Sequence, residues 1–118
     1  MKKIYFGHSS DIDYNLLYNL LLESTLYQSN NIFLPHLNGQ NVNTIELIKK
    51  CDLFIAEVSK PSTGLGIELG IAYEYKIPIA CLFKTGNKPS SSLKYISTKF
   101  IEYSDEISFL KSVEELLF

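Results

Sequence analysis

The stretch that decides the fold is residues 56–70, which read AEVSKPSTGLGIELG. It starts in an apolar run typical of a buried strand, passes through a turn rich in Ser and Gly, and ends in a pattern with helical spacing. A strand that leads through a short turn into a helix is the repeating unit of α/β folds with a parallel sheet. We therefore expect further strand–helix pairs along the chain.

Glu68 is the unusual residue of this stretch. If the helix begins near Leu65, its inward stripe contains Leu65, Leu69, Ala72 and either Tyr75 or Lys76. Glu68 falls on that stripe, where an unpaired carboxylate is costly and needs a reason. A capping box is a weak explanation, because the residue three positions earlier is Leu65 and not Ser or Thr. A helix dipole favours a charged carboxylate in the first turn, so we interpret Glu68 as a candidate nucleophile or electrostatic stabiliser.

The turn before Glu68 has the composition of an anion site. Ser62, Thr63, Gly64 and Gly66 offer hydroxyls and backbone N–H groups at a helix N-terminus, which favours a phosphate. The glycine spacing is not that of the dinucleotide fingerprint, and no P-loop lysine follows. The glycines alone fit a plain tight turn equally well. The proximity of Glu68 favours the phosphate site.

Composition restricts the class of protein. The 118 residues form one expected domain, 1–118, with 46% hydrophobic residues and a net charge of −2. No basic patch indicates nucleic acid, no apolar run is long enough for a membrane span, and no signal peptide precedes the first strand. Cys51 and Cys81 are expected to be buried thiols, and with His8 and His36 they do not make a recognisable metal site. We expect a cytoplasmic protein without metal or cofactor.

Hydrophobic periodicity predicts the order of the elements. Strands are expected at residues 3–6, 32–34, 53–58, 78–83 and 100–103. Helices are expected after Asp11 or Asp13, around 42–48, from about 65, and from Asp105 to Leu117, with a loop over 85–92. This alternation predicts an α/β fold: a single flavodoxin-like, Rossmann-like three-layer domain whose five-stranded parallel sheet has the order 2-1-3-4-5. Its ligands bind beyond the carboxyl ends of strands 1 and 3.

The segments that meet at this edge resemble the nucleoside 2'-deoxyribosyltransferase superfamily, and most closely its 2'-deoxynucleoside 5'-monophosphate N-glycosidases. The likeness is carried by IYF at 4–6 with Ser9, DLFIAEV at 52–58, PS-x-G-x-G-x-ELG-x-A at 61–72, and PIACLF at 78–83. The specific part of the match runs from residue 52 to residue 83. Elsewhere the likeness is looser, although the order of elements fits.

The resemblance implies a covalent mechanism. Glu68 would attack C1' of a (deoxy)ribose, displace the base and form a glycosyl-enzyme ester that water then opens. Tyr5 would hydrogen-bond the carboxylate and orient it; without the resemblance, Tyr5 is simply an aromatic core residue of the first strand. A second carboxylate, Glu57, ends the third strand at the same edge, where it orders a loop or the sugar hydroxyls, or pairs with Lys60.

The resemblance also implies which residues hold the 5'-phosphate: Ser9, Ser62, and the amides of Gly64 and Gly66. The run at 90–92 falls where the hydrolases place a phosphate-binding serine from a neighbouring subunit. Ser91 or Ser92 would then complete the site in a homodimer, although a solvated loop is an equally good interpretation. The apolar run at 20–22 suits either a subunit contact or the core.

One position departs from the family pattern. The hydrolases carry an aspartate, which helps to protonate the leaving base or to position the sugar, where this chain has Thr44. Threonine is no acid, and loss of a general acid typically lowers a rate by about 10²- to 10⁴-fold. His36, which follows the second strand, is a candidate proton donor, as are Asp11 and Asp13, while a lone histidine beside a proline is also commonly structural.

These residues give a leading hypothesis and two alternatives. The leading one is a hydrolase that converts (deoxy)nucleoside 5'-monophosphates to free base and sugar 5-phosphate. A nucleoside 2'-deoxyribosyltransferase would instead pass the sugar of a nucleoside to a second base. A nucleotide-binding or sensing module with weak chemistry is the third possibility, and Thr44 favours it.

Overall fold

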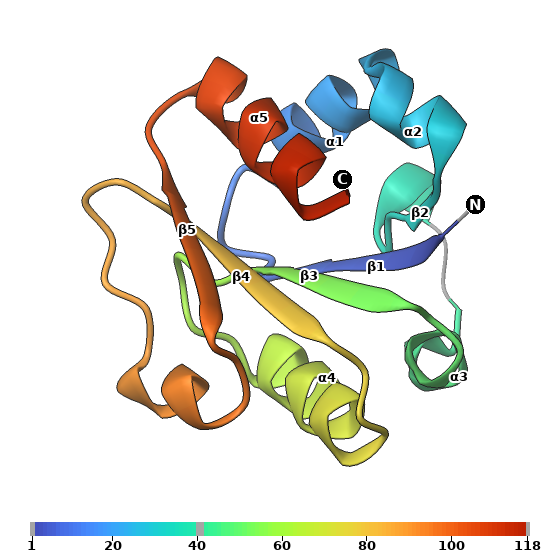
Figure 1. Cartoon of the computed structure of the whole chain (residues 1–118), viewed down its shortest axis with the longest axis vertical. Coiled ribbons are helices and arrows are strands. Elements are labelled where there is room, and N and C mark those ends of the chain that lie inside the picture. The colour runs from blue at the N-terminus through green and yellow to red at the C-terminus, as the bar shows by residue number, and fades with distance from the viewer. Residues whose placement is uncertain (1, 40–41, 118) are drawn as a thin grey trace.

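The computed structural model describes residues 2–39 and 42–117, in which five parallel strands form one sheet with the order β2-β1-β3-β4-β5, as predicted (Figure 1). The strands are β1 (Lys3–His8), β2 (Asn31–Phe33), β3 (Leu53–Glu57), β4 (Ile79–Lys84) and β5 (Lys99–Tyr103). β1 and β3 lie side by side with Tyr5 opposite Phe54 and His8 opposite Glu57. This register brings the carboxyl ends of both strands to the same edge.

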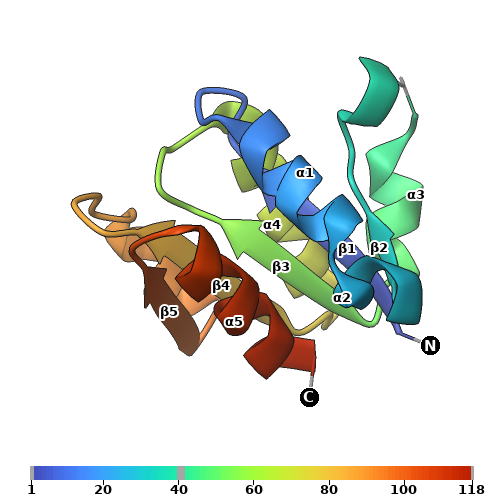
Figure 2. The same cartoon turned by 90° about the horizontal axis from the view of Figure 1, so that it is seen from above.

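Helices cover both faces of the sheet, which gives the expected three layers (Figures 1 and 2). One face carries α1 (Tyr14–Glu23), α2 (Thr25–Ser29) and α5 (Glu106–Leu117), and the other carries α3 (Thr44–Lys49) and α4 (Thr63–Glu74). Side chains alternate along each strand, so Ile4 and Phe6 pack under α1 and α5, while Tyr5 packs on the side of α3 and α4. None of the helices in the described part of the chain is long and apolar enough to cross a membrane.

The first predicted helix is in fact two helices. Ser24 has an extended backbone, and its hydroxyl donates to the Leu21 carbonyl at 2.7 Å, which separates α1 from α2. Asp13 caps α1 by accepting a hydrogen bond from the Leu16 amide at 3.3 Å. Leu21 is fully buried, and Leu20 and Leu22 pack against the same core cluster, so the apolar run at 20–22 belongs to the core and gives no support to a subunit contact.

α4 also differs from the prediction at both ends. It begins at Thr63, two residues earlier than expected, because the Ser62 hydroxyl oxygen accepts the Leu65 amide at 3.1 Å and caps the helix there. It ends at Glu74, so Tyr75 and Lys76 lie outside the helix and are exposed, not part of its buried stripe.

Smaller differences concern the turns. Val42 precedes α3 and is not part of it, and the end of the predicted 85–92 loop enters a 3-10 helix, η2 (Ser91–Tyr95). A second 3-10 helix, η1 (Leu37–Gly39), follows β2. Cys51 and Cys81 are buried and unbridged, as expected, and burial raises the pKa of Cys81 to about 11.

Gly7 permits the close packing of β1 against its neighbours. A Cβ at this position would lie 2.5 Å from Phe54 Cζ and 3.1 Å from Leu65 Cδ1. Because Phe54 contacts Tyr5 and Leu65 lies in the first turn of α4, an added methyl group would displace the elements that frame the edge of the sheet.

We therefore expect Gly7→Ala to lower the free energy of unfolding in urea by about 1–3 kcal/mol, as overpacking of a tight core does. Gly70→Ala is the matched control: no atom lies within 4 Å of the added Cβ in α4, so this change should be neutral or stabilising by up to about 1 kcal/mol. Equal stability of the Gly7→Ala variant and the unchanged protein would contradict the packing described.

Candidate active site

A cavity of about 510 Å³ lies at the carboxyl end of β1, beside the first turns of α4. Its lining includes the predicted site residues His36, Thr44, Ser62, Gly64 and Glu68. Residues that sequence analysis did not single out for this site also line it, namely His8, Ser10, Pro35, Val42 and Leu65. We call this space the Glu68 cavity.

Glu68, which lines this cavity, is hydrogen-bonded to Tyr5 of β1. The Tyr5 hydroxyl donates to Glu68 Oε2 at 2.5 Å, although the residues are 63 positions apart in the chain. Tyr5 is 1% exposed, and its ring packs against Phe33 and Phe54 at centroid distances of 5.8 and 5.0 Å. Burial, together with the hydrogen bond to Glu68, raises the pKa of Tyr5. The phenol therefore keeps its proton and acts as the hydrogen-bond donor to the carboxylate. Glu68 itself is half-buried and faces the cavity.

The N-terminus of α4 forms one wall. The oxygen of Ser62 accepts the Leu65 amide, which leaves the hydroxyl proton of Ser62 available to a ligand. Thr63 and Gly64 line the cavity in the first turn, where backbone N–H groups lack partners within the helix. The Gly66 amide, by contrast, donates to the Ser62 carbonyl at 3.0 Å and is not available to a phosphate. Of the predicted anion site, Ser62, Thr63 and Gly64 line the cavity, and we call these three residues the cradle.

The early start of α4 also moves Glu68 out of the first turn. Helix-dipole effects fall off within that turn, so the dipole supports the charge of Glu68 less than the sequence suggested. The direct hydrogen bond from Tyr5 is the stronger local interaction with this carboxylate.

Three of the predicted phosphate ligands, Ser9, Ser91 and Ser92, do not line the Glu68 cavity of their own chain. Ser9 is 0% exposed, and its hydroxyl oxygen accepts the Asp11 amide at 3.0 Å; its neighbour Ser10 lines the cavity instead. Ser92 lines a separate groove of about 320 Å³ beside α4, and Ser91 is exposed in η2. Within one chain, neither Ser91 nor Ser92 lines the Glu68 cavity.

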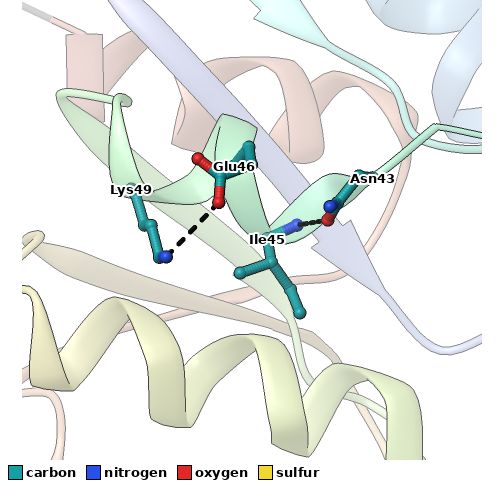
Figure 3. A network of polar contacts seen from close by, with 4 residues as sticks. All are labelled: Asn43, Ile45, Glu46 and Lys49. Carbon is teal, nitrogen blue, oxygen red and sulfur yellow. Dashed lines mark hydrogen bonds and ion pairs between the residues drawn. The ribbon is translucent and has the colours of Figure 1, made fainter.

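Thr44 reaches the cavity because α3 begins at this residue. Asn43 caps the helix by accepting the Ile45 amide at 3.2 Å, and Glu46 pairs with Lys49 at 3.4 Å (Figure 3). The Thr44 side chain hydrogen-bonds Tyr5, which opposes in part the rise in the pKa of that phenol. Thr44 and Glu68 thus both line the cavity and both interact with the Tyr5 hydroxyl behind them.

A second hydrogen-bonded group, which sequence analysis missed, surrounds His8, another residue that lines the Glu68 cavity. His8 is 5% exposed, and its Nδ1 lies 2.9 Å from the Ser9 carbonyl, so Nδ1 carries the proton. Its Nε2 therefore accepts from the Tyr18 hydroxyl at 2.6 Å, and the Tyr18 oxygen accepts the His36 amide at 3.0 Å. The Tyr14 ring stacks on His8 at 4.8 Å. The only sequence signal was the Tyr14/Tyr18 pair at helical spacing.

This group fixes His36 at the mouth of the cavity, whereas the other proton-donor candidates lie away from it. Asp13 caps α1, and Asp11 is exposed; neither lines the Glu68 cavity. Among residues 2–39 and 42–117, no three His, Cys, Asp or Glu side chains are grouped so that they could hold a metal ion.

The His8 network predicts a pH dependence of stability. Burial lowers the pKa of His8 below its ordinary value of 6.5, so the unfolded chain binds a proton more readily than the folded one. Stability should then fall as the pH drops below 6.5, by up to about 1.4 kcal/mol per pH unit. Urea unfolding at pH 7.5 and 5.5 should show this loss, and His8→Gln should reduce it. An identical loss in both proteins would contradict the buried neutral imidazole.

Comparison with known proteins supports the resemblance. No protein-family model matches the chain. It is 40% identical over 53 residues to the provisionally named 2'-deoxynucleoside 5'-phosphate N-hydrolase 1 of Syntrophotalea carbinolica, a match that covers 44% of this chain and 37% of the relative. It is 35% identical over 52 residues to the 5-hydroxymethyl-dUMP N-hydrolase of Tetraodon nigroviridis, with 42% and 37% covered. The chain is similar to nucleotide N-hydrolases.

The human 5-hydroxymethyl-dUMP N-hydrolase is 42% identical over 40 residues, with 34% of this chain and 23% of the relative covered. The chain thus spans less than half the length of the curated relatives that it matches.

Two solved structures extend the likeness over the whole fold. The Clostridium botulinum CMP N-glycosidase superposes with a TM-score of 0.70 at 22% identity, covering 96% of this chain and 99% of that one. A conserved protein from Enterococcus faecalis gives a TM-score of 0.64 at 19% identity, covering 98% and 99%. These matches agree with the predicted fold and strand order.

Proposed function

We propose that this chain is an N-glycosidase that hydrolyses nucleoside 5'-monophosphates to free base and sugar 5-phosphate. The observation that carries the proposal is the Glu68 cavity, where a carboxylate held by Tyr5 lies beside the open N-terminus of α4. The names of the curated relatives and of the Clostridium botulinum structure point to the same class of reaction. The volume of the cavity, about 510 Å³, lies in the range of small-molecule sites, and we place the phosphate of a nucleotide at Ser62, Thr63 and Gly64.

The reaction has two displacements. In the first, a Glu68 oxygen bonds to C1' of the sugar, the C1'–N bond breaks, and the base leaves with the electron pair and takes up a proton. In the second, water adds to C1' and loses a proton, the ester bond breaks, and the sugar 5-phosphate leaves. Tyr5 keeps one carboxylate oxygen in place and leaves the other to attack.

His36 is the group we assign to protonate the leaving base. It is exposed at the mouth of the cavity, and its backbone is tied to Tyr18, while Thr44 has no acidic proton to give. Thr44 instead hydrogen-bonds Tyr5 and faces the sugar.

We further propose a homodimer in which Ser91 or Ser92 of a second copy completes the phosphate site. The chain's own Ser91 and Ser92 lie outside the Glu68 cavity, so only a neighbouring copy could supply them. The two unbridged, buried thiols suit a reducing compartment, and we place the reaction in the cytoplasm.

Thr44 favours one second candidate, a nucleotide-binding or sensing module. Such a module would keep the cradle of Ser62, Thr63 and Gly64 but lack efficient transfer of a proton to the base. It predicts saturable binding of nucleotides without release of base.

The test is chromatography of products from a panel of ribo- and deoxyribonucleoside monophosphates. We expect free base and sugar 5-phosphate in equal amounts, and Glu68→Gln should lower the rate by roughly 10³-fold or more because the nucleophile is lost. Glu46→Gln on the exposed face of α3 is the matched control and should retain activity.

Undiminished base release by folded Glu68→Gln protein would refute the assignment of the nucleophile. Binding without turnover in the unchanged protein would favour the sensing module, and formation of a new nucleoside after addition of a second base would indicate base exchange.

A further inference from the structure

A second carboxylate at the same edge of the sheet, Glu57, is not used by the proposed mechanism. It is the last residue of β3 and is 1% exposed, in contrast to half-buried Glu68. Its oxygens accept hydrogen bonds from the Ser59 amide at 2.6 Å, from the Ser59 hydroxyl at 2.9 Å and from the Tyr103 hydroxyl. Sequence analysis also offered an ion pair between Glu57 and Lys60. Among the described residues the ion pair that forms joins Glu46 and Lys49, so Glu57 is held by hydrogen bonds and not by Lys60.

The partners of Glu57 explain why this position carries a carboxylate. All three groups are donors, and the Ser59 oxygen is already an acceptor, because the Lys84 amide donates to it at 2.8 Å. An ionised carboxylate has only acceptor sites and matches this arrangement. A glutamine would turn an NH₂ group towards one or more donors, so the isosteric change would break the network without changing its volume.

The network fixes the connection between β3 and α4. The amide and the hydroxyl of Ser59 both donate to Glu57, and its hydroxyl oxygen accepts the Lys84 amide at the end of β4. Tyr103, the last residue of β5, donates to Glu57 and ties that carboxylate to β5. We call Glu57, Ser59 and Tyr103 the Glu57 clamp. Figure 2 shows this connection running from the end of β3 to the start of α4. Only Lys60 and Pro61 separate Ser59 from Ser62, and the proline ring restricts that short segment further.

We propose that Glu57 is a positioning residue for the phosphate: through Ser59 it holds the start of α4 so that Ser62, Thr63 and Gly64 converge on one anion. This inference rests on the proposed function in assigning a phosphate to that cradle. Glu57 does not touch the substrate. Glu68 lies further along α4, beyond its first turn, and is held separately by Tyr5 of β1, so the clamp governs binding of the phosphate end and not the chemical step.

The experiment compares Glu57→Gln and Ser59→Ala with Ser97→Ala. Ser97 is a matched control because it is buried to a similar degree as Ser59, at 7% exposed, and its hydroxyl donates to the Ile79 carbonyl at 2.7 Å near the start of β4, at the opposite edge of the sheet. Two quantities are measured: KM and kcat for a nucleoside monophosphate, and the Kd of ribose 5-phosphate by titration calorimetry.

We expect Glu57→Gln and Ser59→Ala to raise both KM and the Kd of ribose 5-phosphate by about 10- to 100-fold, as displacement of binding groups by about an ångström does, with kcat within about twofold. Ser97→Ala should lower Tm and leave KM and Kd unchanged. If Glu57→Gln does not fold, Ser59→Ala decides the question.

The inference is overturned if both clamp variants lower Tm but keep the Kd and KM of the unchanged protein, or if kcat falls while KM stays constant. If the unchanged protein binds ribose 5-phosphate but releases no base, the proposed hydrolysis fails, while the Kd values still test the clamp.

Discussion

The hydrogen bond from Tyr5 to Glu68 is the interaction on which the site depends. It joins β1 to α4 across 63 positions of the chain, and it exists because the alternation of β1 turns Tyr5 towards α4 while Ile4 and Phe6 face the opposite core. The rings of Phe33 and Phe54 hold the phenol in place. A half-buried carboxylate is stable here because a fixed, protonated donor accompanies it into the apolar surroundings.

The two carboxylates at this edge of the sheet differ in their surroundings, and this difference separates their proposed roles. Glu57 accepts hydrogen bonds from three donors and is buried, so this carboxylate holds the backbone and does not face a ligand. Glu68 has Tyr5 on one oxygen and a cavity beside it, so it can still react. We therefore assign Glu57 to positioning the cradle and Glu68 to reaction with the ligand. The surroundings of each carboxylate determine its role.

The sequence sufficed for the strand order and for the inward position of Glu68, because both follow from local patterns of apolar residues. It did not suffice for the choice of Ser10 over Ser9, or for the loss of the Gly66 amide to Ser62, because these depend on which of several possible local hydrogen bonds the folded backbone makes. The partners of Glu57 and His8 were out of reach for another reason. Tyr103 lies 46 positions from Glu57, and no spacing rule connects two residues that only the folded sheet brings together.

The most direct test of this account is to trap the covalent intermediate. The protein is mixed with a nucleoside 5'-monophosphate, quenched in acid within a turnover and digested, and the peptides are weighed by mass spectrometry. The account predicts that the peptide containing Glu68 gains the mass of one sugar 5-phosphate less water, and that this adduct is absent from Glu68→Gln protein. Release of base at full rate with the Glu68 peptide unmodified, or with the sugar on another residue, would contradict it.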